Sequence, residues 1–116
     1  MELYLLGRII FGAYFVYSGF NHFQNEKAMT GYAKHKGVPS PRFAVLLSGA
    51  MLMLGGLGFI TGTNMTQASL ALLLFLIPTT FMMHAFWKVS DPLHKLGERI
   101  NFLKNMALIG ALLMML

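Results

Sequence analysis

A set of polar and aromatic side chains recurs inside, or at the ends of, long apolar runs in this chain. Its members are Tyr17, Asn21, His22, His84, Trp87, Lys104 and Asn105. A histidine or lysine can hydrogen-bond a carbonyl of a flat, lipid-soluble ring such as a quinone, and tyrosine and tryptophan can stack beside that ring. We therefore take these residues as a candidate cofactor-binding pocket.

The two histidines of this set admit a second cofactor. His22 and His84 lie on different runs and could ligate a haem iron from its two sides. Two histidines are a weak signal for haem, so the quinone is the preferred interpretation. The chain has no cysteine, which removes thiolate nucleophiles and cysteine-ligated metals. We predict no catalytic residue and no metal site.

The acidic residues argue against ion pumping. The four carboxylates all lie outside the apolar runs, at Glu2, Glu26, Asp91 and Glu98. Proton relays and cation transporters usually carry an acid at membrane depth. Secondary transporters are also commonly built from internal repeats, and none is visible in this chain.

Four apolar runs must position the candidate pocket. They cover residues 3–23, 43–61, 68–87 and 100–116, in a chain of 116 residues that is 56% hydrophobic and 11% charged. At ~1.5 Å per residue the first run extends ~31 Å, about the thickness of the hydrocarbon core. Between Leu70 and Met83 the only polar side chains are those of Thr79 and Thr80, so this run lacks the polar face of a soluble helix. We predict an all-α integral membrane four-helix bundle that forms a single domain over residues 1–116.

The connections between the runs predict how the bundle is oriented. The loops over residues 24–42 and 88–99 hold seven basic residues: Lys27, Lys34, Lys36, Arg42, Lys88, Lys95 and Arg99. The connection over residues 62–67 is uncharged. By the positive-inside rule the two basic loops face the cytoplasm and both termini lie outside. Because these cations flank apolar runs, the net charge of +5 indicates the lipid bilayer as partner and not nucleic acid.

In this orientation the candidate pocket residues share the cytoplasmic leaflet. Within the first run Tyr14, Tyr17, Ser18, Asn21 and His22 follow helical spacing and form one stripe. Two interpretations remain open, because depth alone does not say which way a side chain faces. The residues could line an inward pocket, or they could form an interfacial belt in which Trp87 and Tyr17 anchor the helices and Lys104 extends toward the headgroups.

Three further patterns concern packing. Small residues four apart, such as Gly58 with Gly62 and Ala107 with Ala111, allow close helix contacts, which we expect within one bundle in preference to a homo-oligomer interface. Pro78 should kink the third run. Asp91 and Pro92 fit the N-cap and first positions of a short interfacial helix that continues into the fourth run.

The chain resembles the DoxX family along nearly its whole length. The likeness is carried by Gly7-Arg8-Ile9-Ile10-Phe11-Gly12, Ser18-Gly19-Phe20-Asn21-His22-Phe23, Gly31-Tyr32-Ala33, Gly37-Val38-Pro39, Leu54-Gly55-Gly56-Leu57, His84-Ala85-Phe86-Trp87, Asp91-Pro92, Asn101-Phe102-Leu103-Lys104-Asn105 and Gly110. The resemblance implies a small four-helix protein of the bacterial inner membrane. Some members are subunits of quinone-linked oxidoreductases or partners of redox proteins. Where many relatives carry a glutamate in the second helix, this chain has Leu52.

Three hypotheses of function follow. The leading one is an accessory membrane subunit that is non-catalytic on its own. It would be linked to a redox system through a quinone or through a cytoplasmic or membrane redox partner. If the protein is catalytic, it would be a subunit of a quinone-linked oxidoreductase. The alternative is a lipid-binding or scaffold protein that docks a cytoplasmic partner on its basic loops. The third is a haem-binding electron carrier.

Overall fold

The computed structural model describes residues 2–116, which form five α-helices and one 3₁₀ helix. The helices are α1 (Glu2–Gln24), α2 (Glu26–His35), α3 (Pro41–Thr61), α4 (Met65–Met83), η1 (Phe86–Lys88) and α5 (Pro92–Met114). The described residues include no strand. The predicted all-α fold is therefore confirmed.

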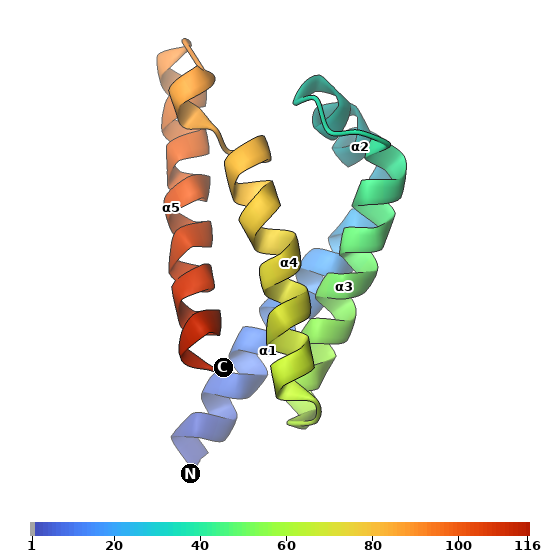
Figure 1. The fold of residues 1–116 in the computed structure, drawn as a ribbon, viewed down its shortest axis with the longest axis vertical. Coiled ribbons are helices and arrows are strands. Elements are labelled where there is room, and N and C mark those ends of the chain that lie inside the picture. The colour runs from blue at the N-terminus through green and yellow to red at the C-terminus, as the bar shows by residue number, and fades with distance from the viewer. Residues whose placement is uncertain (1) are drawn as a thin grey trace.

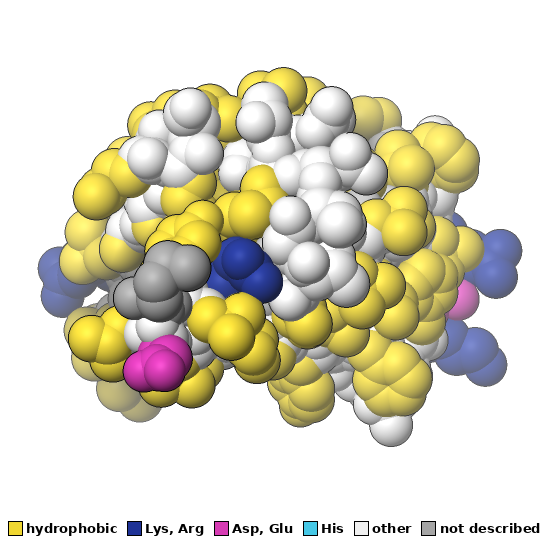
Figure 2. Space-filling model, turned by 90° about the horizontal axis from the view of Figure 1, so that it is seen from below, with side chains coloured by type: hydrophobic (Ala, Val, Ile, Leu, Met, Phe, Trp, Pro, Cys, Tyr) yellow, Lys and Arg dark blue, Asp and Glu magenta, His cyan; other side chains and the backbone are white. Residues whose placement is uncertain are grey.

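The long helices run between two chemically different ends. One end carries α2, the connection from α4 to α5 and the first turns of α5 (Figure 1). We call it the basic end because residues 24–42 and 88–99, which meet there, hold seven cations. The opposite end, here the terminal end, carries both chain ends and the turn between α3 and α4. Viewed from the terminal end, the surface is mostly apolar or uncharged (Figure 2). This asymmetry agrees with the charge pattern read from the sequence.

Within residues 2–116, three segments are long and apolar enough to cross a membrane: Glu2–Gln24, Pro41–Thr61 and Met65–Lys88. They contain the first three predicted spans. The fourth predicted span, residues 100–116, falls largely within α5, which is 23 residues long but is not among the three. The reason is the charge of α5, which holds Lys95, Glu98, Arg99 and Lys104.

Glycines allow α1 and α3 to pack with their backbones in close approach. A Cβ atom added to Gly12 of α1 would lie 2.5 Å from the carbonyl oxygen of Gly56, and one added to Gly19 would lie 2.6 Å from that of Gly49. Lipid tails are as apolar as the helix surfaces, so close contact rather than water exclusion holds such helices together. The expected tight packing within one bundle is confirmed for the glycines of α3.

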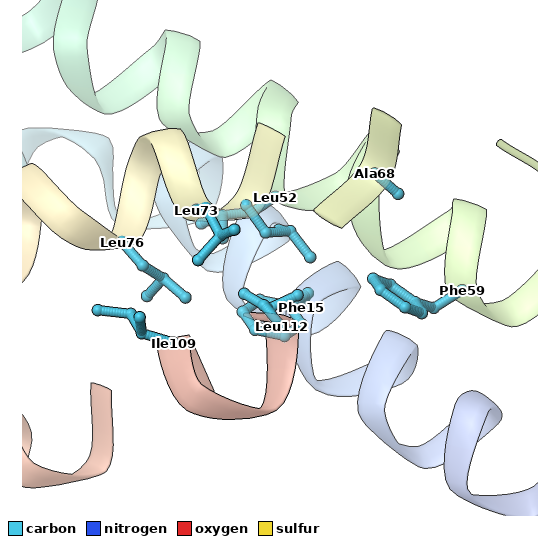
Figure 3. Close-up of a cluster of buried hydrophobic side chains, with 9 residues drawn as sticks. Phe15, Leu52, Phe59, Ala68, Leu73, Leu76, Ile109 and Leu112 are labelled. Carbon is cyan, nitrogen blue, oxygen red and sulfur yellow. The ribbon is translucent and has the colours of Figure 1, made fainter. Parts of the chain in front are cut away.

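The apolar core gathers side chains from four helices. Phe15 of α1, Leu52 and Phe59 of α3, Leu72 of α4 and Leu112 of α5 are fully buried in it. Figure 3 shows Phe15, Leu52 and Leu112 close together, with Phe59 on one side and Leu76 and Ile109 on the other. Leu52, at 0% exposure, is thus a residue of the apolar core.

The connections differ from the expected loops in two places. The first basic loop contains α2, which the sequence reasoning did not predict. The third predicted span reaches Trp87, but α4 ends at Met83 and the backbone leaves helical geometry at His84 (φ −118°, ψ 37°). The predicted start of α5 is confirmed, since the Asp91 carboxylate accepts a 2.9 Å hydrogen bond from the backbone N–H of His94 and Pro92 is the first helical residue. This helix continues without a break into the fourth predicted span.

Candidate ligand-binding cavity

A cavity of about 650 Å³ lies among the five α-helices, between the apolar core and the basic end. Most of the lining is apolar and includes Met29, Met51, Met82 and Met83. The polar side chains that line it are Tyr14, Ser18, His22, Tyr32, Ser48, Thr79, His84, Lys104 and Asn105. A mostly apolar cavity with a few convergent polar groups is typical of small-molecule binding sites.

The structure brings together four of the seven candidate residues. His22, His84, Lys104 and Asn105 line the cavity from α1, the α4–η1 connection and α5. The remaining three, Tyr17, Asn21 and Trp87, do not line it. The seven residues therefore do not form one group in the structure.

The polar stripe on α1 divides into two faces. Tyr14, Ser18 and His22 recur every four residues and line the cavity. Tyr17 points away from the bundle, with 70% of its surface exposed. The Asn21 side chain lies beside the α1–α2 junction, where it accepts a hydrogen bond from the Asn25 amide.

Trp87 lies on the outside of the bundle near the basic end. Its surface is 49% exposed, and its ring packs edge-on against Phe86 and Phe102, with centroids 5.3 and 5.5 Å away. An exposed tryptophan near the end of a helical hairpin suits an interfacial anchor. This placement fits the interfacial-belt interpretation for Trp87.

His22 is buried and held by the backbone of α3. Its Nδ1 lies 3.1 Å from the Val45 carbonyl oxygen and 3.0 Å from the Ser48 hydroxyl, which itself donates to the same carbonyl. A carbonyl can only accept, so the hydrogen-bond network places the proton of neutral His22 on Nδ1. Nε2 is then left as an acceptor.

Lys104 and Asn105 supply donors on the α5 side of the cavity. The Lys104 ammonium lies 5.8 Å from the centre of the Tyr14 ring. Asn105 is only 6% exposed. The hydrogen bonds of the neighbouring polar residues go to Val45, Ser48 and Glu98 and do not involve either side chain. Both are therefore available to a bound molecule.

Glu98 is the buried acid that the sequence reasoning missed. It belongs to α5 and not to a loop, and it is only 3% exposed. Its carboxylate accepts hydrogen bonds from the Tyr32 hydroxyl, from Lys36 Nζ at 2.7 Å and from His84 Nδ1 at 3.0 Å. His94 Nε2 lies 3.9 Å away. We call Tyr32, Lys36, His84 and Glu98 the carboxylate cluster; it joins α2 to α5 at the basic end.

The carboxylate cluster keeps Glu98 ionised. Burial raises the pKa of Glu98, but the hydrogen bonds from Lys36, Tyr32 and His84 and the charge of Lys36 outweigh burial and lower this pKa to about 2. Burial, together with the hydrogen bond and negative charge of Glu98, raises the pKa of the Tyr32 phenol. Tyr32 therefore remains a donor.

One signal in the sequence could have indicated the cluster. Ala28, Met29, Tyr32 and Ala33 all line the cavity, at the three- and four-residue spacings of one helix face. Extending this face by one turn reaches Lys36. The first basic loop could thus have been recognised as an amphipathic helix with a lysine and a tyrosine facing the bundle.

These features define a multi-pass helical membrane protein with an apolar cavity among its helices. The sequence profile of the DoxX family matches residues 3–85, and the chain belongs to that family. The resemblance inferred from the sequence is thereby confirmed, although the matched residues end before Asp91 and leave out α5. No curated protein and no solved structure matches the chain.

Proposed function

We propose that this protein is an accessory membrane subunit that binds a quinone, in its quinone or quinol form, in the cavity beneath the basic end. The observation that carries this proposal is the pairing of an apolar cavity of about 650 Å³ with both kinds of hydrogen-bonding group. Lys104 and Asn105 offer donors to quinone carbonyls. His22 and His84 each use Nδ1 on the protein and keep Nε2 as an acceptor for a quinol hydroxyl.

The electron donor or acceptor would be a partner protein. The described residues include no group of three or more histidine or acidic side chains arranged for a metal ion. In this function the chain binds and orients the ring, and a redox protein in the membrane or at the basic end carries out the electron transfer.

Two neighbouring positions on α1 allow a matched test. Ser18 lines the cavity, whereas Tyr17 is mostly exposed on the other face of the helix. Ser18→Trp should fill the cavity and Tyr17→Trp should leave it open. We expect mass spectrometry of protein purified from native membranes to detect a bound quinone in the wild type and in Tyr17→Trp, and none in Ser18→Trp.

Other outcomes would favour the remaining hypotheses. Phospholipid alone in the wild-type protein would contradict quinone binding and favour a lipid-binding or scaffold protein. The second candidate cofactor is a haem, because a histidine that donates from Nδ1 to the protein presents Nε2 to a metal. A visible absorption spectrum of the same sample decides this case, since a protein without a Soret band carries no haem.

A further inference from the structure

Glu98 is placed to act on whatever His84 touches in the cavity. It is the one acid among the described residues that is buried, and it reaches the cavity through the imidazole of His84. Three donors hold it: Tyr32 of α2, Lys36 at the C-cap of α2, and His84 from the α4–η1 connection. A carboxylate behind a histidine at a ligand cavity orients the ring and stabilises its protonated form.

The hydrogen bonds fix which nitrogen of His84 carries the proton. Ionised Glu98 can only accept, so the proton of neutral His84 must lie on Nδ1, which donates to Glu98 Oε1 at 3.0 Å. The remaining polar atom of the ring, Nε2, then has a free lone pair. Because His84 lines the cavity, that lone pair is the feature it offers to a ligand.

We propose that His84 and Glu98 form a proton-accepting pair for a phenolic hydroxyl, such as that of a hydroquinone, bound in the cavity. This inference rests on the proposed function and specifies what one side of the site does. In the step the ligand O–H bond breaks and an Nε2–H bond forms. The oxygen keeps the electron pair as a phenolate, and the new imidazolium is balanced by the carboxylate of Glu98. No electron is transferred in this step.

The other charged groups near the pair are compatible with this role. Tyr32 of α2 and Lys36, the C-cap residue of α2, face Glu98. His94 lies beside Glu98 on α5 and is exposed at the basic end. His22 and Lys104 face the cavity from α1 and α5. The ammonium of Lys104 can stabilise a phenolate. His94, which is half exposed, is a second titratable group that lies close to Glu98 and is open to water.

Removing the charge of Glu98 should shift the pKa of a bound phenol, and the direction of the shift distinguishes two roles for Glu98. If Glu98 were only a nearby negative charge, removing it would favour the phenolate and lower the pKa of a bound phenol. If Glu98 supports His84 as the proton acceptor, removing it raises that pKa. A nitrophenol with an alkyl chain, whose phenol and phenolate forms differ in colour, can be titrated while bound to the full-length protein in lipid nanodiscs.

We expect Glu98→Gln to shift the phenol–phenolate equilibrium of the bound probe toward the phenol by about ten-fold, or about one pKa unit. His84→Gln should give the same shift, because its amide still donates to Glu98 but takes up no proton. It also provides the test if Glu98→Gln does not fold. Glu26→Gln is the matched control, since Glu26 pairs with Arg42 away from the cavity, and it should leave the titration unchanged.

An unchanged or lowered probe pKa in His84→Gln or Glu98→Gln would overturn the proton-accepting pair while leaving quinone binding intact. If the wild-type protein binds neither the nitrophenol nor a short-chain quinone, the proposed function itself would be overturned. The two failures are therefore distinguishable in one set of measurements.

Discussion

Glu98 and Lys36 form an ion pair with little access to water. Their side chains are 4% and 12% exposed, and Nζ lies 2.7 Å from Oε2. Removing one member of such a pair leaves an unbalanced charge in a poorly hydrated place, which typically costs about 3–5 kcal/mol. We expect Glu98→Gln to lower the free energy of unfolding in detergent by an amount in this range. The double variant Glu98→Gln/Lys36→Met removes both charges and should recover most of the loss.

The same pair predicts how stability depends on pH. The pKa of Glu98 is lowered from 4.5 to about 2 in the folded protein, so the folded state binds the proton more weakly than the unfolded state. The stabilisation is complete above about pH 4.5 and is lost as the pH falls toward about 2. The difference in stability between wild type and Glu98→Gln should therefore shrink over that window. A constant difference there would contradict the ion-pair assignment.

Single residues also show where sequence reasoning stops. The depth of His22, His84, Lys104 and Asn105 follows from their positions in the apolar runs, and all four line the cavity. The direction in which a side chain points is a different property, because it depends on the positions of the neighbouring helices. Tyr17 follows the same helical spacing as Tyr14 and Ser18, yet it faces away from the bundle.

Among the elements, α1 and α3 depend on glycines at fixed positions. A methyl group at Gly12 would lie 2.5 Å from the Gly56 carbonyl oxygen and 2.8 Å from the Ile60 side chain. Gly7, on the same helix, has no atom within 4 Å of such a methyl group. We expect Gly12→Ala to destabilise the bundle by about 1–3 kcal/mol through overpacking, as measured by thermal unfolding in detergent.

Gly7→Ala is the matched control for this helix pair and should cost nothing measurable. Equal effects of the two substitutions would show that the helix propensity of α1, and not its contact with α3, decides stability. Gly110 of α5 is a further control in a different helix, since it also has open space around it.

The helices themselves were the most predictable part of the fold. Long apolar runs define α1, α3 and α4 because lipid leaves the backbone no partner outside the helix. The sequence did not reveal α2 because the first basic loop was interpreted from its charge. The helical spacing of its apolar residues was not considered. In α5 the apolar residues Leu93, Leu96, Ile100 and Leu103 are exposed. In a membrane the apolar face of a helix such as α5 points outward to the lipid. The opposite face of α5, which carries Glu98, then points into the bundle.

On the scale of the whole molecule, the two ends differ in charge, and this difference predicts the orientation in the membrane. The basic end carries the seven cations of the first and third connections, while the turn between α3 and α4 is uncharged. The positive-inside rule places the basic end in the cytoplasm. His35 lies at the basic end and Thr63 in the turn at the terminal end, and both are exposed.

The absence of cysteine makes this orientation directly measurable. His35→Cys and Thr63→Cys each introduce a single thiol at one end, and the unsubstituted protein is the blank. In whole cells an impermeant thiol reagent should label Thr63→Cys and should reach His35→Cys only after the membrane is permeabilised. The reverse pattern would place the basic end outside. In that case His84 and Glu98 would lie toward the side of the membrane away from the cytoplasm, and the redox partner would have to be sought on that side.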